Sequence, residues 1–91
     1  MERQARRLRI VGRVQGVGYR WWAEQTATRL HLHGWVRNCA DGSVELLAIG
    51  SADVLDQLVE ACRQGPAGAM VREIKVMAAE DDGAIGFETR R

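Results

Sequence analysis

The first change of pattern along the chain separates a strand from a helix. Apolar residues alternate with a mostly basic set over residues 7–14, and this period of two predicts a strand with one face packed on helices. From Arg20 the apolar positions recur with a helical period, at Trp22, Ala23, Thr26, Ala27 and Leu30. We expect this helix to run to His31 or Leu32 and Gly34 to end it.

A hairpin and a second helix are predicted in the middle of the chain. Residues 35–39 and 44–49 have the composition of strands, and the Asp-Gly pair within residues 40–43 is typical of a hairpin turn. Ser51 is placed to cap the second helix, and Gly65-Pro66 ends it. The apolar stripe of this helix is Val54, Leu55, Leu58, Val59 and Cys62.

The last third of the chain adds two strands. Residues 70–78 alternate enough to form a fourth strand, and the turn residues 81–83 precede a short strand at 85–89. The order strand, helix, strand, strand, helix, strand is that of the ferredoxin-like split βαβ sandwich. We therefore predict an α+β fold of the βαββαβ type, with an antiparallel sheet, two helices on one face and a short extra C-terminal strand. Residues 1–91 should form a single domain.

Composition narrows the class of protein without naming a function. The 91 residues are 46% hydrophobic and 27% charged with a net charge of +1, which gives no reason to expect nucleic acid as a partner. Arginines dominate the first 20 residues; they either attract anionic ligands or form a solvated strand face. Cys39 and Cys62 lack a metal-ligand spacing, and no segment has the pattern of a membrane span or a signal peptide. We expect a cytoplasmic monomer with reduced thiols.

Residues 12–20 join the first strand to the first helix and have the composition of an anion site. Gly16 and Gly18 can adopt positive φ angles that let neighbouring amides converge, and the first N–H groups of a helix have no partner within it. Arg20 adds a permanent cation that can hold two phosphate oxygens at once. The glycines can equally serve a tight turn alone. The chain has neither a Gly-Lys-Ser/Thr ending nor a Gly-x-Gly-x-x-Gly spacing here, so small phosphate compounds remain as the ligand class.

Asn38 is the unusual residue of the second strand. Asparagine is depleted from strands, and the alternation places Asn38 on the face of Val36, with Trp35, Arg37 and Cys39 on the other. One interpretation is that Asn38 ends the strand and bonds to the backbone of the hairpin. The other is that its amide serves a site. Cys39 is expected to be a small buried hydrophobic residue.

Residues 12–20 and 34–50 resemble the two signature patterns of the acylphosphatase family, small enzymes that hydrolyse the carboxyl-phosphate bond of acyl phosphates to a carboxylate and inorganic phosphate. Both segments have the family's spacing, and the Gly65-Pro66 turn and the Gly86-Phe87-Glu88 ending are also similar to the family. The similarity covers nearly the whole chain. One departure is Thr89 before the final arginines, where the family more often has an apolar residue, and it leaves the packing of the last strand open.

The resemblance implies a metal-independent acylphosphatase that uses no cofactor. In this family pattern Arg20 is the phosphate-binding arginine and Asn38 positions the attacking water. The residues implied to form the backbone cradle for phosphate are Gln15, Gly16, Val17, Gly18 and Tyr19. The substrate is then a small acyl phosphate, with inorganic phosphate as product and inhibitor.

The residue types suit this chemistry. A carboxylate, with a pKa of about 4, leaves without being protonated, so no general acid is needed. Arg20 can stabilise the charge that the phosphoryl transition state spreads over its oxygens, and the neutral amide of Asn38 orients water without repelling phosphate. Neither motif supplies a candidate base, so we expect the proton to leave to an oxygen of the substrate. His31 and His33 lie at the far end of the first helix and are expected to be surface or capping residues.

Two other classes stay open at this point. A non-catalytic phosphate or acyl-phosphate binding module carries the same loop without turnover. An RNA-binding protein of this fold needs exposed aromatic residues on its central strands, whereas Trp21 and Trp22 fall on the helix. Trp22 is expected in the core, and Trp21 and Trp35 belong either to the core or beside the site.

Overall fold

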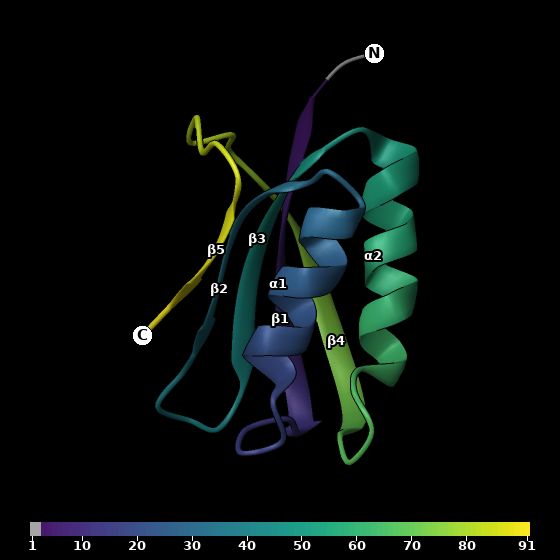
Figure 1. Ribbon diagram of the computed structural model, residues 1–91, viewed down its shortest axis with the longest axis vertical. Helices are drawn as coiled ribbons and strands as arrows, with labels where there is room; N and C mark the ends of the chain where they lie inside the picture. The colour runs from purple at the N-terminus through teal and green to yellow at the C-terminus, as the bar shows by residue number, and fades with distance from the viewer. Residues whose placement is uncertain (1–2) are drawn as a thin grey trace.

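A computed structural model describes residues 3–91 of the chain, which form a five-stranded sheet and two helices (Figure 1). The elements in chain order are β1 (Gln4–Arg13), α1 (Tyr19–Arg29), β2 (His33–Asn38), β3 (Val44–Gly50), α2 (Ala52–Gln64), β4 (Met70–Ala79) and β5 (Phe87–Arg90). The strand order across the sheet is β4-β1-β3-β2-β5. Both helices lie on the same face of the sheet, in front of it in Figure 1. The predicted α+β, ferredoxin-like arrangement is confirmed.

The sheet is mixed, which corrects the prediction of an antiparallel sheet. β1 pairs antiparallel with β3 and β4, and β3 pairs antiparallel with β2. β5 instead runs parallel to β2, with Gly34 opposite Phe87 and Arg37 opposite Arg90. β4 runs opposite to β2, and the chain reverses direction in residues 80–86. The strand that follows therefore runs in the direction of β2.

The main core lies between the two helices and the covered face of the sheet. The predicted stripe of α2 is confirmed, because Leu55, Leu58 and Cys62 are at most 1% exposed and Val59 is also buried. Trp22 is partly buried against this core. The residues that α1 buries are Tyr19, Ala23, Thr26 and Ala27. The strands contribute Leu8, Ile10, Val36, Val44, Leu46 and Ala48.

A smaller cluster packs on the opposite face of the sheet. Its buried members are Ala5, Trp35, Leu47 and Ile49, and Ala84 packs against them from the loop before β5. Trp35 is therefore a core residue of this face, only 6% exposed. The guanidinium groups of Arg37 and Arg90 lie over the Trp35 ring, 5.2 and 5.1 Å from its centroid. Arg90 thus packs the last strand against Trp35. This contact answers how the last strand packs, which the sequence alone did not decide.

α1 ends earlier than its apolar period predicts. The helix stops at Arg29, and His31 takes a left-handed conformation with φ 59°. Leu32 then enters the main core and is 3% exposed. Gly34 does not end the helix but lies within β2, at φ 134°. A Cβ there would overlap the carbonyl oxygen of Leu47 on β3, so glycine is what permits this close strand pairing.

Both ends of α2 lie at the predicted residues, but the expected side-chain cap at the first end is not formed. Ser51 occupies the N-cap position, but its side chain makes no capping hydrogen bond. The Ser51 carbonyl accepts the Leu55 N–H at 2.9 Å, and Asp53 places a negative charge in the first turn, where the helix dipole favours it. Gly65 ends the helix as predicted. Within residues 3–91, neither helix is long and apolar enough to cross a membrane.

Candidate active site

The loop between β1 and α1 has backbone angles that favour glycine at two positions. Gly16 and Gly18 have φ angles of 75° and 78°, in the left-handed region that costs other residues roughly 1–2 kcal/mol. The space around both positions is open, so the need for glycine comes from these angles and not from crowding. Gly18 is also the N-cap of α1. The loop therefore turns sharply into the first turn of the helix.

The backbone N–H groups of this loop are available to a ligand. Within the described residues, the amides of residues 16–20 donate no hydrogen bond to another residue. Consecutive unpaired amides at a helix N-terminus favour an anion, because both the donors and the helix dipole attract negative charge.

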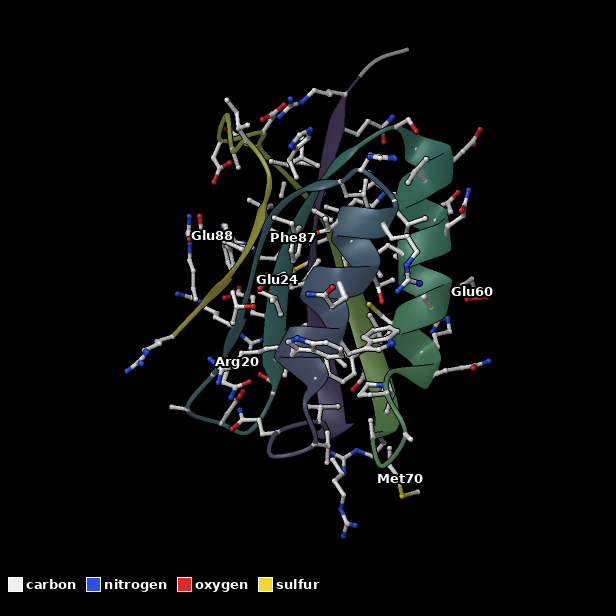
Figure 2. All side chains as sticks on the ribbon, in the orientation of Figure 1. Arg20, Glu24, Glu60, Met70, Phe87 and Glu88 are labelled. Atoms are coloured by element: carbon white, nitrogen blue, oxygen red, sulfur yellow. The ribbon has the colours of Figure 1, made fainter. Side chains whose placement is uncertain are left out.

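Arg20 lies in the first turn of α1, directly after the loop. Its Nη1 donates a hydrogen bond to the carbonyl oxygen of Arg90 on β5 at 3.0 Å. A guanidinium has five N–H donors, so this bond leaves others for a ligand. Figure 2 shows Arg20 and Glu24 on the same side of α1, the side that faces β2 and β5. The contact with Arg90 holds the Arg20 side chain in a direction that no local sequence pattern predicts.

Gln15 connects the loop to the β2–β3 hairpin. Its Nε2 donates to the carbonyl oxygen of Cys39 at 2.8 Å and to that of Ser43 at 2.9 Å. These two carbonyls lie on either side of the hairpin turn, so both N–H groups of the Gln15 amide are used. The family resemblance implies only a backbone role for Gln15, in the phosphate cradle. The structure shows that its side chain fixes the loop beside the end of β2.

Asn38 is the last residue of β2 and is half-buried. The hairpin turn that follows is closed by other groups: Cys39 N–H donates to the Ser43 carbonyl at 2.8 Å, and Asp41 accepts from Ser43 N–H at 2.9 Å. The hydrogen bonds that Ser43 donates, with help from nearby Arg9, lower the pKa of Asp41. In the described part of the chain, the Asn38 side chain makes none of the hydrogen bonds of this turn. Its amide is therefore free to serve a ligand.

A cavity of about 460 Å³ brings these parts together. Its walls are formed by Val14, Gln15, Gly16, Gly18, Tyr19, Arg20, Trp21, Glu24, Asn38 and Thr89. Arg20, Asn38 and the predicted loop residues therefore lie around one space, although the two motifs are separate in sequence. Val17 differs from its neighbours, because its side chain packs against the main core.

Tyr19 and Glu24 line this cavity together with Arg20 and differ in their surroundings. Tyr19 is 1% exposed, and its hydroxyl donates to the carbonyl oxygen of Cys62 at 2.6 Å. Burial raises the pKa of Tyr19 far above its usual value, so this hydroxyl stays protonated. The carboxylate of Glu24 accepts a hydrogen bond from Thr89 Oγ1 at 2.5 Å.

Groups that the sequence placed away from the site stay away from it. His33 lies in β2 and not at the end of the first helix, which corrects its expected position, and its Nδ1 accepts the N–H of Gly86 at 2.8 Å. Cys39 is only half-buried, which corrects its expected burial, whereas Cys62 is fully buried. Residues 3–91 contain no group of three or more His, Cys, Asp or Glu side chains placed to hold a metal ion.

Glu24 and Thr89 line the cavity although no sequence motif indicates them, and Trp21 lines it in one of its two expected locations. Trp21 is 69% exposed and lines the cavity beside Arg20, which decides between the two locations considered for it. Glu24 lies four residues after Arg20, so helical spacing places both on one side of α1. Thr89 comes from β5, and no local signal in the sequence connects it with α1.

The fold and this cavity define an α+β protein of ferredoxin-like topology, with a loop of unpaired backbone amides at the start of its first helix and an amide side chain on the wall of the same cavity. Comparison with known proteins gives the family. The sequence pattern of the acylphosphatase family matches residues 6–89. The chain belongs to this family.

Individual relatives agree with this assignment. The acylphosphatase of Alcanivorax borkumensis is 56% identical over 73 residues, which are 80% of this chain and 79% of that protein. The acylphosphatase of Acidiphilium cryptum is 48% identical over 86 residues, 94% of each chain. The crystal structure of acylphosphatase from Bacillus subtilis superposes with a TM-score of 0.93 at 36% identity, covering 96% of this chain and 98% of that one. The family and these relatives support acylphosphatase activity, which acts on small acyl phosphates, over a binding module without turnover.

Proposed function

We propose that the cavity hydrolyses the carboxyl-phosphate bond of acyl phosphates, with Arg20 and the amides of residues 16–20 binding the phosphoryl group and Asn38 positioning the attacking water. The observation that carries this proposal is the arrangement around one cavity. Unpaired loop amides, an arginine with free donors and an amide side chain outside the hairpin's own bonds all face the same space.

Phosphate binding follows from the donors. The N–H groups of the loop supply several hydrogen bonds to the phosphoryl oxygens without adding a side chain. Arg20 adds charge-assisted bonds, which are roughly twice as strong as neutral ones. Since the transition state spreads negative charge over these oxygens, the same donors stabilise it. Binding and catalysis then share one set of groups.

Asn38 positions the attacking water in this proposal. Its carbonyl oxygen can accept a hydrogen bond from water and its NH₂ can donate one, and neither carries a charge that opposes phosphate. Holding the water in line with the scissile bond replaces a random encounter by a fixed one. The leaving carboxylate departs as an anion, and the proton of the water goes to an oxygen of the substrate.

We also propose that the chain is a single domain, acts as a monomer in the cytoplasm and needs no metal or cofactor.

Binding of inorganic phosphate tests the loop. Phosphate at 100 times its dissociation constant should add about 2.7 kcal/mol to the free energy of unfolding and should inhibit hydrolysis of benzoyl phosphate competitively. In Arg20→Ala both effects should weaken, because the phosphate loses its charged donors. The measurements are melting temperature against phosphate concentration and the inhibition constant.

Arg29 supplies the matched control. It is an exposed arginine in the last turn of the same helix, so Arg29→Ala removes an equal charge far from the loop. This variant should respond to phosphate as the unaltered protein does. If Arg20→Ala keeps the full response and Arg29→Ala loses it, the anion binds elsewhere and the proposed site is wrong.

A further inference from the structure

The cavity is larger than the phosphate donors require. The loop and Arg20 form one part of its wall, and Asn38 closes it from β2. The remaining wall comes from Trp21 and Glu24 on α1 and from Thr89 on β5. None of these three side chains has a role in the proposed phosphate chemistry. They line the space that is left for the other half of the substrate, its acyl group.

Trp21 offers this space an apolar surface. An exposed tryptophan alone needs no explanation, but this one lies next to Arg20 and lines the same cavity. Its side chain is outside the main core, because α1 packs there through Tyr19, Ala23 and Ala27. With 69% of its surface exposed, Trp21 has most of an aromatic ring available to cover an apolar or aromatic group.

Glu24 gives the same wall a negative charge. Its carboxylate accepts the hydrogen bond from Thr89 Oγ1, which ties α1 to β5 and holds the charge at the cavity. It forms no ion pair with Arg20 among the pairs of residues 3–91. A second carboxylate brought to this wall by a substrate would therefore meet a like charge.

We propose that Trp21, Glu24 and Thr89 form an acyl subsite that prefers uncharged aromatic or apolar acyl groups and disfavours acyl groups that carry a carboxylate. This inference rests on the proposed function of the same cavity. The Trp21 ring stacks on or packs against the acyl group. Glu24, held by Thr89, repels an acyl carboxylate.

Three acyl phosphates test the subsite. Benzoyl phosphate is aromatic, acetyl phosphate is small, and succinyl phosphate carries a carboxylate. In Trp21→Ala, kcat/KM for benzoyl phosphate should fall severalfold more than kcat/KM for acetyl phosphate, up to about tenfold, as expected for one aromatic contact. Trp21→Phe should restore most of the ratio. In Glu24→Gln, which keeps an acceptor for Thr89, succinyl phosphate should gain severalfold relative to acetyl phosphate.

Met70 provides a control for the loss of an exposed apolar side chain. It is also 69% exposed but lies at the start of β4 and does not line the cavity; Figure 2 shows it away from Arg20 and Glu24. Met70→Ala should leave the ratios between the three substrates unchanged. Equal losses on benzoyl and acetyl phosphate in Trp21→Ala, or no relative gain for succinyl phosphate in Glu24→Gln, would overturn the subsite.

Failure of the subsite can be told apart from failure of the proposed function. Arg20→Ala and Asn38→Ala should lose activity on all three substrates alike, whatever Trp21 does. Non-hydrolysable benzoylphosphonate and acetylphosphonate report binding without turnover, and Trp21→Ala should weaken the first more than the second. If the protein binds benzoylphosphonate through Trp21 but hydrolyses none of the three substrates, the proposed subsite is supported and the proposed hydrolysis is contradicted.

Discussion

Tyr19 shows how one residue can serve both the loop and the core. Its backbone lies where the loop becomes α1, while its side chain is buried and donates to the Cys62 carbonyl near the end of α2. Carbonyl groups in the last turn of a helix lack partners within it, so the Tyr19 hydroxyl satisfies one of them. The side chain thereby anchors the N-terminal end of α1 against α2. This anchoring gives the loop amides a rigid base.

Cys62 makes stability depend on pH at the alkaline end. Burial raises the pKa of Cys62 to about 12, whereas an unfolded thiol titrates near its ordinary value of 9.0. Above that value the unfolded chain loses the proton and the folded chain keeps it. The free energy of unfolding should therefore be unaffected by this thiol below about pH 9, and should fall by up to about 1.4 kcal/mol per pH unit as the pH rises from there toward 12.

Urea unfolding between pH 8 and pH 10 measures this effect, in a Cys39→Ala background where Cys62 is the remaining cysteine. The matched control adds Cys62→Ala, which removes the titrating thiol. Tyr19 adds a loss of the same sign above its ordinary pKa of 10.0, so the comparison stops there. Parallel pH curves for the two proteins would mean that the folded thiol titrates normally.

At the scale of elements, the site depends on the contact between the β1–α1 loop and the β2–β3 hairpin. Gln15 makes this contact with two hydrogen bonds to hairpin carbonyls. The loop carries the phosphate donors, and the hairpin strand carries Asn38. These two hydrogen bonds thus help to set the distance between phosphate and water in the proposed mechanism.

Gln15→Glu is predicted to uncouple the two elements. The carboxylate cannot donate and would face two carbonyl oxygens, so both hydrogen bonds are lost. At about 1 kcal/mol each, the expected fall in kcat/KM for benzoyl phosphate is roughly tenfold to thirtyfold. Gln25→Glu, an exposed change on α1, is the control of equal charge. Steady-state kinetics that show the same small effect in both variants would remove Gln15 from the positioning role.

The elements themselves were largely predictable from the sequence, because each has a clear apolar period. The alternation in β1 and the stripe of α2 correspond directly to buried faces. The end of α1 was not predictable in this way, since the burial of Leu32 and the close pairing at Gly34 decide it. The parallel direction of β5 follows from a long-range pairing with β2 that no local pattern contains.

The candidate site was predictable only in part for the same reason. The motifs contain Arg20, Asn38 and the loop, so the sequence identified them, and the cavity brings them together. Trp21, Glu24 and Thr89 carry no motif, and their place beside the cavity depends on how α1 and β5 pack. The Gln15 side chain likewise acts through a contact between two elements.

At the scale of the whole molecule, the basic N-terminal region is largely neutralised. Arg3, Arg6, Arg7 and Arg9 form ion pairs with Asp81, Asp56, Glu45 and Asp41, which come from other parts of the chain. Glu45 is 5% exposed and pairs with both Arg7 and Arg37. These contacts favour the interpretation of the arginines as a paired strand face over that of an open attraction site for anions.

The paired arginines are therefore expected to contribute little to substrate capture. Arg6 pairs with Asp56, whose side chain is 68% exposed, and an exposed pair contributes about 0–1 kcal/mol. Arg6→Ala should change kcat/KM for benzoyl phosphate by less than about twofold at low salt, where long-range attraction is strongest. A large fall in kcat/KM that disappears when salt is added would instead support the interpretation that this region attracts anionic substrates.

The central claim is that Arg20 holds the phosphoryl group and Asn38 holds the water. Arg20 would contact phosphate in ground state and transition state, so Arg20→Ala should raise KM and lower kcat together. Asn38 would contact only the water. Removing its amide should therefore affect the rate without affecting the affinity for phosphate.

The most direct measurement is made on Asn38→Ala, with kcat on benzoyl phosphate and the inhibition constant of inorganic phosphate determined on the same folded sample. We predict that kcat drops by roughly 10²-fold or more, because one positioned transition-state donor contributes about that much. The inhibition constant should stay within about twofold, a smaller change than the loss of one hydrogen bond to a charged group would cause. Circular dichroism confirms the fold. A near-normal kcat, or a loss of phosphate affinity like that of Arg20→Ala, would contradict the account.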